Sequence, residues 1–214
     1  DFGTWIGHVW QDGEEINLAN FVPAGIQEVG EATGVSRDGE WVVGINALTE
    51  LWEQFPYRYN AASGVLEVLE ISDPCPWWDW FCFGSKPFNP YDIADDGTMI
   101  GTFGTAGGSQ AAIVSEALGG EHKLAEFLKG QGVVNATDLE LVSGGVKITS
   151  GGRHITGWTA VDGYWGSYVL TLDQLFVCEK GKSKRVGYPG AVADKLSNGA
   201  TLGMCETDLP LKYK

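Results

Sequence analysis

VSRDGEWVVG at residues 35–44 is the first of three copies of one pattern, followed by IADDGTMIG at residues 93–101 and ITSGGRHITG at residues 148–157. The turn glycines Gly39, Gly97 and Gly152 lie 58 and 55 residues apart. Asp-Gly and Gly-Gly pairs favour the positive φ angles of a tight hairpin turn, and the flanking apolar residues alternate as in a half-buried strand. The pattern therefore predicts three β-hairpins in a repeat protein.

Two further apolar segments follow each hairpin and complete the repeat. The first members are residues 55–59, 111–114 and 167–170, and the second members are residues 64–69, 123–128 and 174–177. Four strands in a repeat make one blade of a β-propeller. The sequence therefore predicts an all-β fold with three four-stranded blades near residues 28–71, 88–128 and 134–177.

Residues 1–27 are predicted to form half a blade, because no hairpin of the repeat precedes them. LANFV at residues 18–22 matches LAEFL at residues 124–128, which supports this alignment. Closed propellers have four to eight blades because the ends of the ring must meet. We expect the incomplete ring to be completed by missing N-terminal blades, by another segment or by another protein subunit. The candidate pairing edge consists of Trp5, His8, Trp10, Ile16 and Leu18.

The composition agrees with an all-β protein and excludes some partners. Thirty-one Gly residues together with 9 Trp, 9 Phe and 7 Tyr indicate many tight turns between aromatic-rich strands. A net charge of −14 repels phosphate backbones and anionic membranes, so we expect no nucleic-acid partner. The sequence offers no long uncharged apolar stretch for membrane insertion and no signal-peptide pattern at its start, so we expect mature, soluble material.

The four cysteines form two local pairs, Cys75 with Cys82 and Cys178 with Cys205. An even count without CxxC or Cys/His spacing favours disulfides over zinc, and disulfides imply an oxidising compartment. The alternative is four buried thiols. With the disulfide, residues 178–214 are predicted to form a small appendage closed by Cys178–Cys205.

The segment between the first two cysteines is unusually aromatic. A short clamped ring that carries Trp77, Trp78, Trp80 and Phe81 offers a rigid apolar surface to a partner protein or to a sugar ring. The alternative is that this loop folds back as a plug over one end of the propeller. We treat it as a candidate interaction loop.

No recognisable catalytic motif accompanies these features. His8, His122 and His154 are too scattered for a metal cluster, and the chain has no G-x-S-x-G nucleophile motif. We therefore expect no catalytic residue and no cofactor. Asp38-Gly39 and Asp95-Asp96-Gly97 could help to bind Ca²⁺, but hairpin turns explain these residues more simply.

On the three hairpins, residues 1–177 resemble the HAF-type extracellular repeat proteins of bacteria, whose units pair a V-S-x-D-G-x-x-V-V-G hairpin with an aromatic strand and a closing G-x-x-x-x-L strand. His8-Val9-Trp10 is the nearest approach to the eponymous tripeptide. The resemblance implies a secreted, β-propeller-like fold and no established chemistry.

Residues 177–205 resemble a short extracellular C-terminal motif of the form C-H-K-G-K-T followed by A-V-x-A-H-L-x-H-G-D-T-L-G-x-C. Glu179, Lys195, Asn198 and Ala200 stand at the places of its three histidines and its aspartate. Any metal site that those groups could form in the motif is therefore lost in this chain.

These observations predict a non-catalytic extracellular structural or binding repeat protein, secreted or held at a bacterial cell surface, as a fragment or subunit of a larger assembly. Carbohydrate is a further possible ligand. The alternative function is a secreted carbohydrate-active hydrolase that uses two carboxylates in the central channel of the propeller.

Overall fold

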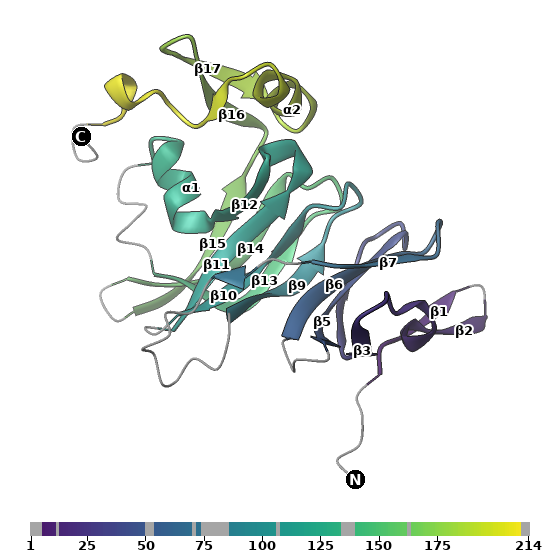
Figure 1. Cartoon of the computed structure of the whole chain (residues 1–214). Coiled ribbons are helices and arrows are strands. Elements are labelled where there is room, and N and C mark those ends of the chain that lie inside the picture. The colour runs from purple at the N-terminus through teal and green to yellow at the C-terminus, as the bar shows by residue number, and fades with distance from the viewer. Residues whose placement is uncertain are drawn as a thin grey trace.

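The computed structural model describes residues 6–11, 13–49, 54–69, 72–73, 86–105, 108–133, 140–161 and 164–210. Antiparallel strands dominate these residues, so the all-β prediction is confirmed. Figure 1 shows the sheets side by side in a row, with β1 and β2 at one end, β15 at the other and a C-terminal segment above.

The row begins with a two-stranded sheet, the N-terminal hairpin, made of β1 (His8–Gln11) and β2 (Glu14–Asn17). A 3-10 turn, η1 (Leu18–Phe21), follows it directly. The Asn17 side chain begins this turn by accepting a hydrogen bond of 2.9 Å from the Ala19 amide, as N-cap residues do. The turn places Leu18 in the core.

The first sheet contains the first predicted hairpin. Its strands pair in the order β3-β5-β6-β7, and β4 also pairs with β5. Gly39, in the turn between β4 and β5, has φ 76°, which only glycine adopts readily. The strands are β3 (Ile26–Val29), β4 (Ala32–Val35), β5 (Trp41–Thr49), β6 (Gln54–Asn60) and β7 (Val65–Val68).

The second sheet is an antiparallel meander that pairs in the order β12-β11-β10-β9-β8. The strand predicted over residues 123–128 is wrong, because the chain forms a helix there. Leu124, Phe127 and Leu128 have the i, i+3, i+4 spacing of a helix face, and all three are buried. The elements are β8 (Ser72–Asp73), β9 (Lys86–Ile93), β10 (Met99–Thr105), β11 (Gly108–Ser115), η2 (Glu116–Leu118), β12 (Gly120–Lys123) and α1 (Leu124–Gly130).

The third sheet has three strands, β13 (Glu140–Ile148), β14 (His154–Val161) and β15 (Tyr164–Thr171). The prediction of a fourth strand in this sheet is wrong. Residues 174–177 are extended, but they belong to β16 (Gln174–Glu179), which pairs with β17 (Lys182–Gly187) and β18 (Thr201–Leu202). With α2 (Gly190–Ser197) and η4 (Glu206–Asp208), these strands make up the C-terminal segment, residues 174–210.

The three sheets share one pattern when they are aligned on Gly44, Gly101 and Gly157. Each glycine lies in the strand after the hairpin turn, where a Cβ atom would meet the Tyr57 hydroxyl at 2.3 Å, the Asn89 carbonyl oxygen at 2.1 Å or the Tyr168 hydroxyl at 2.5 Å. The glycines are therefore required by close packing.

This alignment shows that equivalent residues face the same way in all three sheets. Val42 packs towards the N-terminal hairpin, Met99 towards the first sheet and Ile155 towards the second sheet. The next residue along the strand points to the opposite side, so Val43 packs against the second sheet and Ile100 against the third. Each sheet therefore has a face towards the sheet before it and a face towards the sheet after it.

Candidate functional site

The three hairpin turns lie next to one another. The Asp38 amide donates to the Asp95 carboxylate at 3.2 Å, and the Asp95 amide donates to the Ser150 carbonyl at 2.8 Å. Asp38 accepts hydrogen bonds from the Ser36 hydroxyl and the Glu40 amide, which lower the pKa of its carboxyl group. These aspartates hold turns together. The part of the chain that the structure describes contains no group of three His, Cys, Asp or Glu side chains arranged to hold a metal ion.

A further carboxylate joins the second and third sheets. The side chain of Asp92 is buried, and its Oδ2 atom accepts a hydrogen bond of 3.0 Å from the Ile148 amide. Its Oδ1 atom lies 3.7 Å from Lys147 Nζ. A buried carboxylate with these partners has a structural task.

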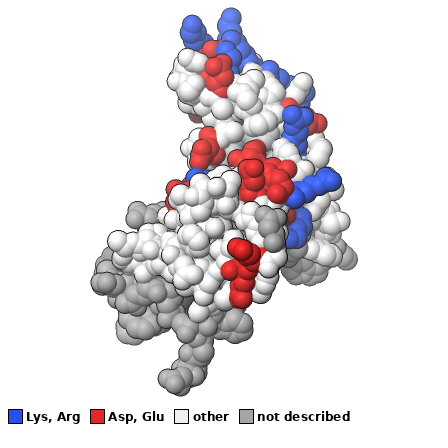
Figure 2. Space-filling model, turned by 90° about the vertical axis from the view of Figure 1, so that its right-hand side faces the viewer, with Lys and Arg blue, Asp and Glu red and all other residues white. Residues whose placement is uncertain are grey.

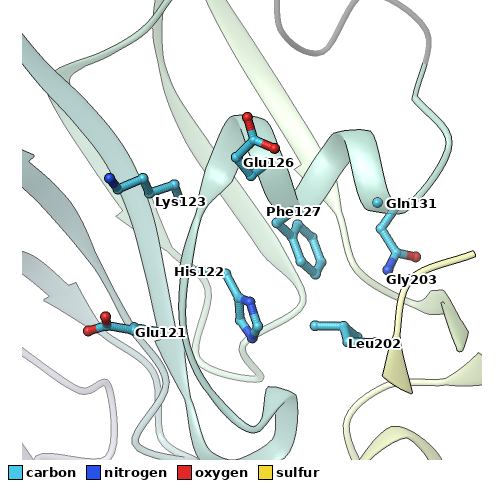
Figure 3. A pocket seen from close by; sticks show the side chains of 9 residues that line it. Glu121, His122, Lys123, Glu126, Phe127, Gln131, Leu202 and Gly203 are labelled. Atoms are coloured by element: carbon cyan, nitrogen blue, oxygen red, sulfur yellow. The ribbon is translucent and has the colours of Figure 1, made fainter. Parts of the chain in front are cut away.

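A cleft of about 280 Å³ lies between the end of the second sheet and the C-terminal segment (Figure 3). His122, Phe127 and Leu202 surround the same space, and His122 Nε2 lies 2.9 Å from the Leu118 carbonyl oxygen. The nine residues that line the cleft include no Ser, Thr or Cys that could act as a nucleophile. One wall is held by Gln131, whose amide both donates to and accepts from the backbone of Phe176.

A second hollow, of about 360 Å³, is lined by Trp41, Arg58 and neighbouring residues of the first sheet. The Arg58 guanidinium lies 5.2 Å from the centre of the Trp41 ring and binds Glu67 at 2.7 Å and Glu116 at 3.0 Å. Because the guanidinium covers one face of the indole ring, that face is not free to stack on a sugar. Arg58 instead links the first sheet to the second.

The predicted pairing edge separates into two groups in the N-terminal hairpin. Leu18 is fully buried, and Ile16 packs against the same core cluster, so both serve the core. His8 and Trp10 lie on the other face, where their rings are 6.0 Å apart and Trp10 is 69% exposed. His8 Nδ1 also lies 2.7 Å from Glu15 Oε1. Trp5 lies outside the described residues.

The outward face of the third sheet carries a surface that the sequence analysis missed. Trp158 is 48% exposed and Val169 is 72% exposed, on the side turned away from the second sheet. Thr156 and Ser167 on the same side are exposed too. The alternation of these residues with the buried Ile155 and Gly157 was visible in the sequence, but it did not reveal what covers each side.

The C-terminal segment is fastened by the disulfide between Cys178 and Cys205, as the sequence predicted. Tyr188 anchors the segment to the second sheet, because its hydroxyl lies 3.1 Å from the Thr98 hydroxyl and 3.2 Å from the Ser115 hydroxyl. Burial raises the pKa of this tyrosine. The other cysteine pair and the aromatic loop, Cys75, Trp77, Trp78, Trp80, Phe81 and Cys82, lie outside the described residues.

Glu179 and Lys195, which the resemblance to the C-terminal motif aligns with histidines, lie next to each other in the structure. Lys195 Nζ lies 3.2 Å from Glu179 Oε1, and Lys184 also binds Glu179. These two lysines lower the pKa of the Glu179 carboxyl group. Figure 2 shows Lys and Arg side chains gathered over this segment, at the top of the molecule. Glu179, Lys184 and Lys195 therefore form an ion-pair cluster in the C-terminal segment.

Comparison with known proteins shows only distant likeness. No family model and no curated protein matches the chain. Two solved structures cover 82% of it: TolB from Acinetobacter baumannii, at 10% identity and a TM-score of 0.42, and a putative TolB from Agrobacterium tumefaciens, at 13% identity and a TM-score of 0.32. The chain spans 35% and 51% of the lengths of these two proteins. Among the described residues, no helix is long and apolar enough to cross a membrane.

Proposed function

We propose that this chain is a non-catalytic extracellular module of a bacterium, in which the sheets are arranged like blades of a β-propeller and serve a larger surface assembly. The observation that carries the proposal is the pattern of covered faces. The first and second sheets are each covered on both faces by core clusters, whereas no described strand covers the outer face of the N-terminal hairpin or of the third sheet. A radial array of sheets is stable when its ends meet further sheets.

The use of the acidic residues supports a structural role rather than hydrolysis. A glycosidase needs two carboxyl groups that are free to act on the substrate. Asp38, Asp92 and Asp95 instead accept backbone hydrogen bonds that join turns and sheets. These three carboxylates therefore support a structural role rather than the hydrolase alternative.

The extracellular location is supported by the disulfide and by the resemblance to extracellular repeats. Disulfides persist in oxidising compartments and are rare in the cytosol. The disulfide closes a segment that is attached to the sheets through Tyr188 and Gln131, so it stabilises a folded appendage. Such an appendage suits a protein that works outside the cell.

Fractionation of cells that produce the protein, followed by native mass measurement without reducing agent, tests this function. We expect the chain in the extracellular or cell-surface fraction, in a complex heavier than its own 23.0 kDa. Recovery of a reduced, monomeric protein from the cytosol would contradict the proposal. Hydrolysis of a glycoside that depends on a carboxylate of this chain would contradict it as well.

A further inference from the structure

We propose that the outer face of the third sheet is a docking surface for a second copy of this chain. The second copy contributes the exposed face of its N-terminal hairpin, so that copies join head to tail. The inference rests on the proposed function and deepens it, because it names both the surface and the partner.

The second and third sheets have equivalent positions that differ in burial. Ile100 and Ile113 lie on the face of the second sheet that packs against the next sheet, and both are fully buried. The equivalent residues of the third sheet are Thr156 and Val169, and both are exposed. The third sheet therefore presents the type of face that is covered by a following sheet elsewhere in this chain.

The side chains of that face are of the kind found in protein interfaces. Trp158 stands at the position of Thr102, which is buried in the second sheet. Tryptophan is enriched at the centres of protein interfaces, and neighbouring exposed apolar side chains mark interaction surfaces. Trp158 and Val169 lie on adjacent paired strands, β14 and β15, so they form one surface.

The N-terminal hairpin carries the matching face. The match between residues 18–22 and residues 124–128 sets Asn17 at the position of Lys123. Asn17 pairs with His8 and Lys123 pairs with Ala112, so His8 corresponds to Ala112. Val9 therefore corresponds to Ile113, and both pack against the following sheet.

By the same alignment, Trp10 corresponds to Val114, which packs towards the preceding sheet. The Trp10 face of the hairpin is thus the type of face that contacts a sheet before it. None of the described strands covers it, and Trp10 is 69% exposed. The two ends of the row of sheets therefore carry complementary types of face.

The two faces also carry opposite charges. Glu15 pairs with Trp10 across the hairpin, and its side chain is 54% exposed. Lys147, at the position of Asp92, has a side chain that is 64% exposed, and its Nζ atom also lies 3.7 Å from Asp92 Oδ1 of the second sheet. In the second sheet, Asp92 is the residue that bonds to the following sheet. Opposite charges across an interface steer association and fix its register.

The arrangement within one chain favours a second copy as the occupant. Figure 1 shows the N-terminal hairpin and β15 at opposite ends of the row, so these two faces do not meet within one molecule. Two copies joined at both ends would bring eight sheets into the row, when each hairpin is counted as one sheet and the sheet of the C-terminal segment is left out. Eight lies within the range of four to eight blades found in closed propellers. Contacts between different faces close into a ring when the rotation allows it.

Sedimentation velocity of the purified 214-residue chain over a range of concentrations tests the proposal. We expect concentration-dependent association, weakened at least about tenfold both by Trp10→Ser and by Trp158→Ser with Val169→Ser. Val65→Ser is the matched control. Val65 is 57% exposed but lies on neither of the two proposed faces, so this substitution should leave association unchanged. An equimolar mixture of the two kinds of variant should regain dimers, since one intact junction remains between them.

The charged pair gives a second readout that does not depend on apolar residues. Glu15→Lys and Lys147→Glu should each weaken association, and the two together in one chain should restore it. Urea unfolding of the Lys147→Glu monomer separates loss of the interface from loss of the ion pair with Asp92. A wild-type chain that stays monomeric at all concentrations would overturn the inference. So would association that Trp10→Ser leaves unchanged, because the contact would then join two copies of the third-sheet face. A monomeric chain found within a native complex of other proteins would leave the proposed function standing and remove only the second copy.

Discussion

The second and third sheets follow the same repeat but differ in what covers them. Ile113 in β11 of the second sheet and Val169 in β15 of the third sheet occupy equivalent positions. Ile113 is nevertheless fully buried, whereas Val169 is 72% exposed. In a repeat array, each unit buries one face only by packing on its neighbour. The difference shows that no described sheet covers the outer face of the third sheet in the way that the third sheet covers the equivalent face of the second.

The largest expected effect compares these two positions directly. Ile113→Ala should lower the free energy of unfolding by about 2 to 5 kcal/mol, because it leaves a cavity between two sheets. Val169→Ala should change the free energy of unfolding of the monomer by less than about 0.5 kcal/mol, because its side chain lies in solvent. Urea unfolding in dilute solution, followed by tryptophan fluorescence, measures both. Equal losses would show that the third sheet is already covered within one molecule.

The next largest effect is expected in the C-terminal segment, which contains the residues that were predicted as the fourth strand of the third sheet. Replacing Cys178 and Cys205 together by Ser should cost about 2 to 4 kcal/mol, because the disulfide closes a loop of 27 residues. Hydrogen exchange should then accelerate first in β16 and β17 and leave the second sheet protected. Uniform acceleration of exchange in every sheet would contradict the prediction that the C-terminal segment is an appendage separate from the sheets.

Glycine substitutions sharpen the comparison at the level of the backbone. Gly101→Ala in the second sheet should destabilise the protein by about 1 to 3 kcal/mol, because the added methyl group would lie 2.1 Å from the Asn89 carbonyl oxygen. Gly151→Ala, in the turn that leads into β14, meets no atom within 4 Å and serves as the control. Thermal unfolding of both variants tests this, and a control that is equally destabilised would contradict the packing argument.

The smallest effect is a dependence on pH in the C-terminal segment. Because Lys184 and Lys195 lower the pKa of Glu179 in the folded state, this carboxylate stabilises the fold at neutral pH. The contribution should be lost as the pH falls from the ordinary value of 4.5 through the lowered pKa. Unfolding of the wild type and of Glu179→Gln from pH 7 to pH 3 should therefore differ at neutral pH and converge in acid. A constant difference would show that the ion pairs contribute nothing.

Local chemistry predicted the hairpins of this fold well. Asp-Gly and Gly-Gly pairs determine turn geometry within a few residues, so the turns at Gly39, Gly97 and Gly152 could be placed from sequence alone. The helix after β12 was missed because a short apolar segment suits either a strand or a helix. The spacing of Leu124, Phe127 and Leu128 was the signal that favoured a helix.

Pairing partners and covered faces were harder to predict. Alternating residues in β16 predict a strand, but the same alternation fits the third sheet or the C-terminal segment, and contacts distant in sequence decide between them. The exposed face around Trp158 was missed for a similar reason, because alternation shows which side chains share a face and not what lies opposite. The split of the predicted edge between buried Leu18 and exposed Trp10 has the same origin.

Hydroxyl-radical footprinting at increasing protein concentration tests the central claim most directly, because it measures the solvent exposure of individual side chains. We predict that oxidation of Trp158 and Trp10 falls together as the chain associates, while oxidation of Trp41 stays constant. Oxidation of Trp158 that remains high while the chain associates would contradict the claim that the outer face of the third sheet is an interface.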